Sequence, residues 1–146
     1  MIMEPSPILM YQKLAGYKYR VARDCYVDLP WLKGVSFDSE WINIEPTMGR
    51  LTGKAGYCYD GASGPTIDTD DSMRGTLWHD IGYQLIRLGV LPKKPYKKLF
   101  DKLLRDTCID AGMPEIRADL WHEFVTGFGN IFGLGKDGRG KILIAP

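Results

Sequence analysis

The fold is decided by residues 72–88, which read SMRGTLWHDIGYQLIRL. Apolar side chains recur there every three or four residues, at Met73, Leu77, Ile81, Leu85 and Leu88. This spacing is typical of a helix with one buried face. Ser72 is an N-cap candidate, and Gly89 favours an end after residue 88. We therefore predict a helix over Ser72–Leu88.

Two more helices follow in the sequence. One is predicted over Pro95–Ala111, where one face carries Leu99, Leu103, Leu104, Cys108 and Ala111. The other begins at Pro114 and carries Ile116, Leu120, Trp121, Phe124, Val125 and Phe128. The connection from Gly89 to Lys94 is short, so the first two helices should be antiparallel.

Residues 1–60 carry strand signals instead. Residues 17–21 alternate apolar and polar side chains, residues 36–44 partly do so, and residues 57–59 are a short aromatic run. Glycines and prolines separate these runs, which predicts four or so short antiparallel strands. The glycine-rich tail ends in Ile142-Leu143-Ile144, which fits either a last strand or a docking segment.

Together these patterns predict an α+β fold, with a small antiparallel β region packed on three helices. The chain has 146 residues, the size of one ordinary domain. We expect a single domain, 1–146, in which 1–60 is mainly β, 61–71 is a loop, 72–132 is helical and 133–146 is a C-terminal tail.

Composition excludes several classes of protein. The net charge of +1 provides no electrostatic footprint for nucleic acid, so no nucleic-acid partner is expected. No apolar run approaches the ~20 residues of a transmembrane segment. Residues 1–14 place Glu4 before a short apolar stretch and lack a basic region, so we expect no signal peptide.

The chain has three cysteines, Cys25, Cys58 and Cys108. An odd number without CxxC spacing argues against a disulfide framework and against a structural zinc site. We expect three buried free thiols and a reducing compartment.

The helical region holds polar residues where a core-facing surface is predicted. His79 and Asp80 lie beside Leu77 and Ile81, and such groups are costly to bury without partners. Tyr83 is one turn further along the same helical surface.

Two more carboxylates complete the predicted site. Asp101 is in the middle of the second helix, between Phe100 and Leu103, and Asp60 opens the loop over 61–71. Carboxylates, loop carbonyls and a histidine together favour a site for a hard cation with a general base beside it.

The order of these residues resembles known families. Asp60-Gly-Ala-Ser, then His79-Asp80-Ile-Gly-Tyr83, then Phe100-Asp101 resembles a family of phage and prophage proteins of unknown function, over about residues 55–105. The same order is more distantly similar to the bacterial secreted phospholipase A2 enzymes. Asn130-Ile131-Phe132-Gly133 is similar to the C-terminal ending of those enzymes.

The resemblance implies a phospholipase A2-like core and a role for each residue. His79 would be the general base, Asp101 would fix its tautomer, and Tyr83 would orient Asp101. Asp80 and Asp60 would hold Ca²⁺ with carbonyls near Gly61, and the cation would polarise the carbonyl of a lipid ester or a related ester or amide.

Other readings remain open. The chain could be a non-catalytic phage structural or accessory protein that keeps this scaffold, with virion or lysis components as partners. In either case the resemblance implies the host cytoplasm or the phage virion as its location. A third reading, a metal phosphohydrolase of the HD type, is disfavoured because that chemistry needs several histidines and only His79 and His122 are present.

Three further features have two readings each. Trp78 and Trp121 suit core packing better than lipid contact, and His122 suits packing in an aromatic helix. The basic stretch made by Lys93, Lys94, Lys97 and Lys98 is interpreted as the solvated start of a helix, with contact to an acidic membrane as the alternative.

Overall fold

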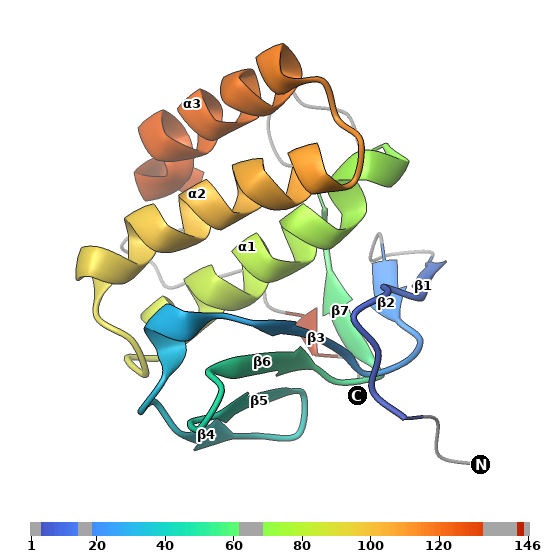
Figure 1. The fold of residues 1–146 in the computed structure, drawn as a ribbon, viewed down its shortest axis with the longest axis vertical. Coiled ribbons are helices and arrows are strands. Elements are labelled where there is room, and N and C mark those ends of the chain that lie inside the picture. The colour runs from blue at the N-terminus through green and yellow to red at the C-terminus, as the bar shows by residue number, and fades with distance from the viewer. Residues whose placement is uncertain (1–3, 15–18, 62–68, 133–142, 145–146) are drawn as a thin grey trace. The chain divides into compact units, whose positions relative to one another are not determined.

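The computed structural model describes residues 4–14, 19–61, 69–132 and 143–144. Contacts divide the chain into two compact units. The first comprises residues 1–59 and 143–146, and the second comprises residues 60–142. Figure 1 labels the elements of both units.

The first unit holds two antiparallel sheets. In one, the strand order is β1 (Tyr11–Lys13), β2 (Tyr19–Val21), β7 (Tyr57–Tyr59) and β8 (Leu143–Ile144). In the other, the order is β3 (Cys25–Asp28), β6 (Arg50–Gly53), β5 (Ile42–Glu45) and β4 (Phe37–Asp38). A short 3-10 turn, Pro30–Leu32, follows β3.

Alternation of side chains explains how these strands pack. Ile42 and Ile44 on β5 are each 1% exposed, while Asn43 between them is half-buried and donates to Asp38 on β4. Adjacent strand residues point to opposite faces, so a buried apolar face and a wetter polar face result. Leu51 is buried opposite Ile44 in the neighbouring strand.

The described part of residues 1–60 holds seven strands, β1 to β7, where four or so were predicted. One predicted strand is also divided in two. Residues 36–44 form a hairpin of β4 and β5 rather than one strand, because the Ser39 hydroxyl oxygen accepts the backbone N–H groups of Trp41 and Ile42 and closes a turn. Residues 17 and 18 of the predicted 17–21 strand lie outside the described residues. Leu143–Ile144 forms the last strand, which was one of the two readings of the tail.

The second unit holds a 3-10 turn, Asp70–Ser72, and the helices α1 (Met73–Arg87), α2 (Lys93–Asp110) and α3 (Glu115–Phe132). These bounds lie within two residues of the predicted ones, and Lys94 is the one non-helical position inside α2. Together with the two sheets, they confirm the α+β class. Among the described residues, no helix is long and apolar enough to cross a membrane.

Helices α1 and α2 lie side by side (Figure 1), and two glycines of α1 face the contact between them. A Cβ on Gly82 would lie 2.2 Å from the ring of Phe100, and one on Gly75 would lie 2.8 Å from Sγ of Cys108. Residues early in α1 therefore meet residues late in α2, so the helices are antiparallel, as predicted. Gly75, His79 and Gly82 recur at four and three residues, which places His79 on the same face of α1.

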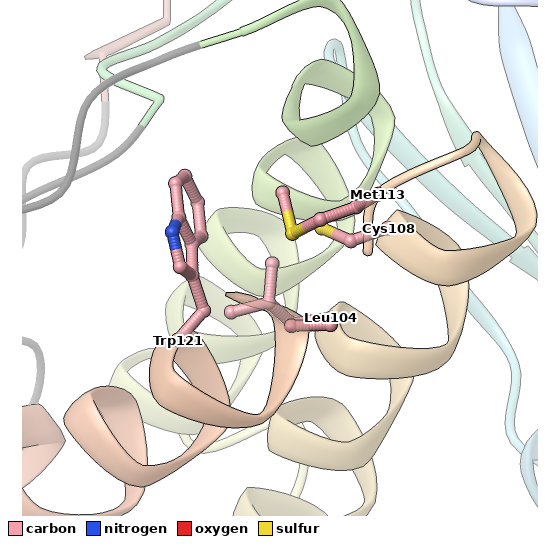
Figure 2. Close-up of a cluster of buried hydrophobic side chains, with 5 residues drawn as sticks. Leu104, Cys108, Met113 and Trp121 are labelled. Carbon is pink, nitrogen blue, oxygen red and sulfur yellow. The ribbon is translucent and has the colours of Figure 1, made fainter. Parts of the chain in front are cut away.

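Helix α3 closes the core of this unit against α2. Figure 2 shows Trp121 of α3 beside Leu104, Cys108 and Met113, and Ala118 completes this cluster of buried side chains. Trp121 is 5% exposed and Trp78 is fully buried, so the core reading of both tryptophans is confirmed and lipid contact by either is wrong. Cys25, Cys58 and Cys108 are all buried thiols, as the sequence predicts.

Candidate active site

Asp101 is the centre of a buried polar cluster between α1 and α2. Its side chain is 1% exposed and accepts hydrogen bonds from three groups. Nε2 of His79 lies 2.9 Å from Oδ1, the hydroxyl of Tyr83 donates to the same oxygen at 2.6 Å, and Nζ of Lys97 donates to Oδ2 at 2.8 Å. These partners come from one face of α1 and from the preceding turn of α2.

The cluster keeps Asp101 ionised. Burial acts to raise the pKa of Asp101, but the hydrogen bond and charge of His79, together with the hydrogen bonds from Lys97 and Tyr83, outweigh it and hold that pKa below its ordinary value. Asp101 therefore accepts hydrogen bonds through both oxygens and has no proton to donate.

An ionised Asp101 assigns the tautomer of His79. Because the carboxylate can only accept, Nε2 of His79 carries the hydrogen of the 2.9 Å bond, and the lone pair of a neutral ring is then on Nδ1. Among the described residues, Nδ1 has no hydrogen-bond partner. The His79 side chain is 12% exposed, so most of the ring is buried and a small part of it is accessible to solvent. This is the arrangement of a general base with an orienting carboxylate.

Tyr83 supports both members of the pair. Its ring is tilted by 40° against the imidazole, with 4.1 Å between ring centroids. Burial and the neighbouring negative charge of Asp101 raise the pKa of Tyr83 far above its ordinary value, so its hydroxyl stays protonated and donates. The predicted cluster of His79, Tyr83 and Asp101 is therefore brought together by the fold.

Lys97 is a member of the cluster that sequence reasoning missed. The reading of Lys97 as part of a solvated helix start is wrong, because the residue is 9% exposed and its ammonium group is bonded to Asp101 and, at 3.4 Å, to the Thr126 carbonyl. The other three lysines of that stretch are exposed, as predicted. The signal was present, since Lys97 precedes Asp101 by four residues on a helix.

The residues predicted to hold a cation lie in the same unit. Asp80 is half-buried on α1 next to His79, Asp60 is half-buried, and Gly61 is buried with a φ of 74°. Both carboxylates make polar interactions. The described residues contain no group of three or more His, Cys, Asp or Glu side chains arranged to hold a metal ion. Residues 62–68 of the predicted loop lie outside the described residues.

His122 stands apart from the cluster. It is half-buried on α3 one residue after Trp121, which is buried in the core of this unit. Arg117, one turn earlier, lies over the Trp121 ring and donates to Thr69 and Asp71, so this end of α3 is bonded to the segment that precedes α1. Because His122 is a histidine outside the cluster, a substitution there serves as a control for a substitution of His79.

Comparison with protein-family models, with curated proteins and with solved structures finds no match for this chain.

Proposed function

We propose that the chain is a phospholipase A2-like hydrolase of the phage type, which cleaves a lipid ester or a related ester or amide. One observation carries the proposal: Nε2 of His79 is bonded to the buried carboxylate of Asp101, while Nδ1 has no partner among the described residues. The order of these residues along the chain, with Tyr83 beside them, is the order that the resemblance implies.

The chemistry follows from the tautomer. Nδ1 of His79 takes a proton from a water molecule as the water oxygen attacks the carbonyl carbon of the ester. The imidazolium that forms keeps its Nε2–H bonded to Asp101, whose negative charge stabilises it. Nδ1 then returns the proton to the leaving alkoxide oxygen as the carbon–oxygen bond breaks, which yields an acid and an alcohol. Tyr83 holds Asp101 in place throughout.

Calcium is the cofactor that the resemblance implies. The donor chemistry fits, since Asp60, Asp80 and the carbonyl of Gly61 offer the oxygen ligands that Ca²⁺ prefers. When bound, the cation would stabilise the negative charge that develops on the carbonyl oxygen. Asp80 follows His79 directly on α1, so its carboxylate belongs to the same region of the helix as the base.

The resemblance to phage and prophage proteins suggests a setting for this activity. We place the protein in the host cytoplasm or in the phage virion, with virion or lysis components as partners and a lipid or small ester as substrate.

A second candidate is a non-catalytic phage structural or accessory protein that keeps the scaffold. Lys97 favours this reading, because it balances the charge of Asp101 and so makes the cluster a satisfied buried network that could stabilise the fold alone.

An assay of fatty-acid release from phospholipid vesicles, with Ca²⁺ and with a chelator, separates the two candidates. If the chain is a hydrolase, the release of fatty acid should depend on Ca²⁺ and on His79. No release from phospholipid or from soluble esters under either condition would favour the structural protein.

A further inference from the structure

Lys97 is a buried lysine whose neighbours provide hydrogen-bond acceptors for its ammonium group. Its side chain is 11% exposed, and a buried ammonium group is costly unless it is paired. Nζ lies 2.8 Å from Oδ2 of Asp101 and 3.4 Å from the carbonyl oxygen of Thr126 on α3. It also lies 6.0 Å from the centroid of the Tyr83 ring. Lys97 therefore links all three helices at the site.

The two oxygens of Asp101 have different partners. Oδ1 receives the bonds from α1, from His79 and Tyr83, whereas Oδ2 receives the bond from Lys97. Rotation of the carboxylate about its Cβ–Cγ bond would break all three bonds. Lys97 lies one helical turn before Asp101 on α2, so its position is fixed by the same helix that carries the carboxylate.

We propose that Lys97 is a positioning residue of this site: its ammonium group fixes Oδ2 of Asp101 and thereby aims Oδ1 at Nε2 of His79. It supplies the counter-charge of the carboxylate within α2 and does not itself touch the substrate. The contribution of Lys97 to hydrolysis rests on the proposed function. The predicted effect of Lys97 on the hydrogen bonding of Asp101 and His79 is independent of that function.

Lys97→Met tests the proposal, because Met keeps an unbranched apolar side chain and removes the charge. Lys98→Met is the matched control, since Lys98 is the next residue on α2 and is exposed. Carboxyl ¹³C NMR as a function of pH should show the pKa of Asp101 rising in Lys97→Met and unchanged in Lys98→Met, because one of the bonds that lower it is lost. Ring ¹⁵N NMR should show a single Nε2–H tautomer of His79 in the wild type and a mixture in Lys97→Met.

Kinetics supply the second readout. On vesicle or ester substrate, kcat of Lys97→Met should fall on the order of tenfold with KM unchanged, as when a group that orients a catalytic residue is removed. Lys97→Arg, which keeps the positive charge, should recover part of the loss. If Lys97→Met does not fold, Lys97→Gln removes the same charge with a polar side chain and takes its place as the test variant.

The failure of each proposal has a different signature. A wild type that cleaves no substrate overturns the proposed function, and the two NMR readouts then decide the role of Lys97. If the Asp101 pKa and the His79 tautomer are the same in Lys97→Met as in Lys98→Met, Lys97 is not a positioning residue. An unchanged kcat in Lys97→Met, with an active wild type, would also overturn its role in hydrolysis.

Discussion

His79 on α1 and Asp101 on α2 are joined by a hydrogen bond of 2.9 Å across the contact between two antiparallel helices. Twenty-two residues separate them in the sequence, so the bond depends on how closely the helices approach. Gly75 and Gly82 permit that approach on either side of His79, because a side chain at either position would meet the opposite helix. The geometry of the site therefore depends on the packing of α1 against α2.

Gly82→Ala should lower the stability of the protein. The new Cβ would lie 2.2 to 2.6 Å from ring atoms of Phe100, which is fully buried, so the helices must separate or the ring must shift. Overpacking of this kind costs about 1–3 kcal/mol. Urea denaturation followed by circular dichroism measures the loss.

Gly127→Ala is the control for that variant. Among the described residues, apart from the adjoining part of α3 itself, no atom lies within 4 Å of a Cβ at this position, so the substitution should be neutral or stabilise by up to about 1 kcal/mol through helix propensity. Equal losses in the two alanine variants would show that the contact at Gly82 does not limit the approach of α1 and α2.

Asp101→Asn should destabilise the protein at neutral pH and not in acid. The variant leaves Lys97 buried without its carboxylate, which costs about 3–5 kcal/mol. The pKa of Asp101 is lowered in the folded state, so the stabilising contribution of the carboxylate is present above its ordinary value of 3.8 and is lost as the pH falls through the folded value. The gap in unfolding free energy between wild type and variant should therefore close in acid.

The double variant Lys97→Met/Asp101→Asn isolates the ion pair. Removing both charges should recover most of the stability that Asp101→Asn alone loses, since no unpaired ion then remains in the core. A double variant that is as unstable as the two single variants combined would mean that the pair is not coupled.

Much of this organisation could be predicted from the sequence. The strong three-to-four periodicity over 72–88 predicts the position of α1. His79 and Asp101 are polar residues in the middle of helices beside apolar faces, which indicates that they are buried and paired with each other. Strand boundaries were harder, since the turn at Ser39 depends on a side chain bonding to the backbone, which periodicity does not detect.

Lys97 was missed for a different reason. It stands among lysines that are exposed, so composition suggested a solvated segment, and only its spacing from Asp101 distinguished it. Whether a lysine on a helix faces water or the core depends on the neighbouring helix. Here α3 covers it with the carbonyl of Thr126.

The three thiols should react with a thiol reagent only after unfolding. Cys25, Cys58 and Cys108 are buried, and burial raises the pKa of the Cys108 thiol to about 12, which leaves little of the reactive thiolate near neutral pH. Titration of the denatured, unreduced protein should count all three. A count of one would mean that two of them form a disulfide.

Calcium should stabilise the folded protein if Asp80 is a ligand. A ligand that binds only the folded state raises the melting temperature by mass action. We expect calorimetry at millimolar Ca²⁺ to show a higher melting temperature for the wild type and no shift for Asp80→Asn. Asp119→Asn, which changes an exposed carboxylate on α3, should respond to calcium as the wild type does. A wild type that does not respond would argue against a calcium site.

The most direct test of the account is the rate of ester cleavage by His79→Ala, compared with His122→Ala. General-base catalysis contributes about 10²- to 10⁴-fold, so loss of His79 should lower kcat by that factor. His122 lies outside the cluster, and its variant should keep the wild-type rate within about twofold, since it removes no catalytic group. Equal rates for wild type, His79→Ala and His122→Ala would contradict the assignment of His79 as the base.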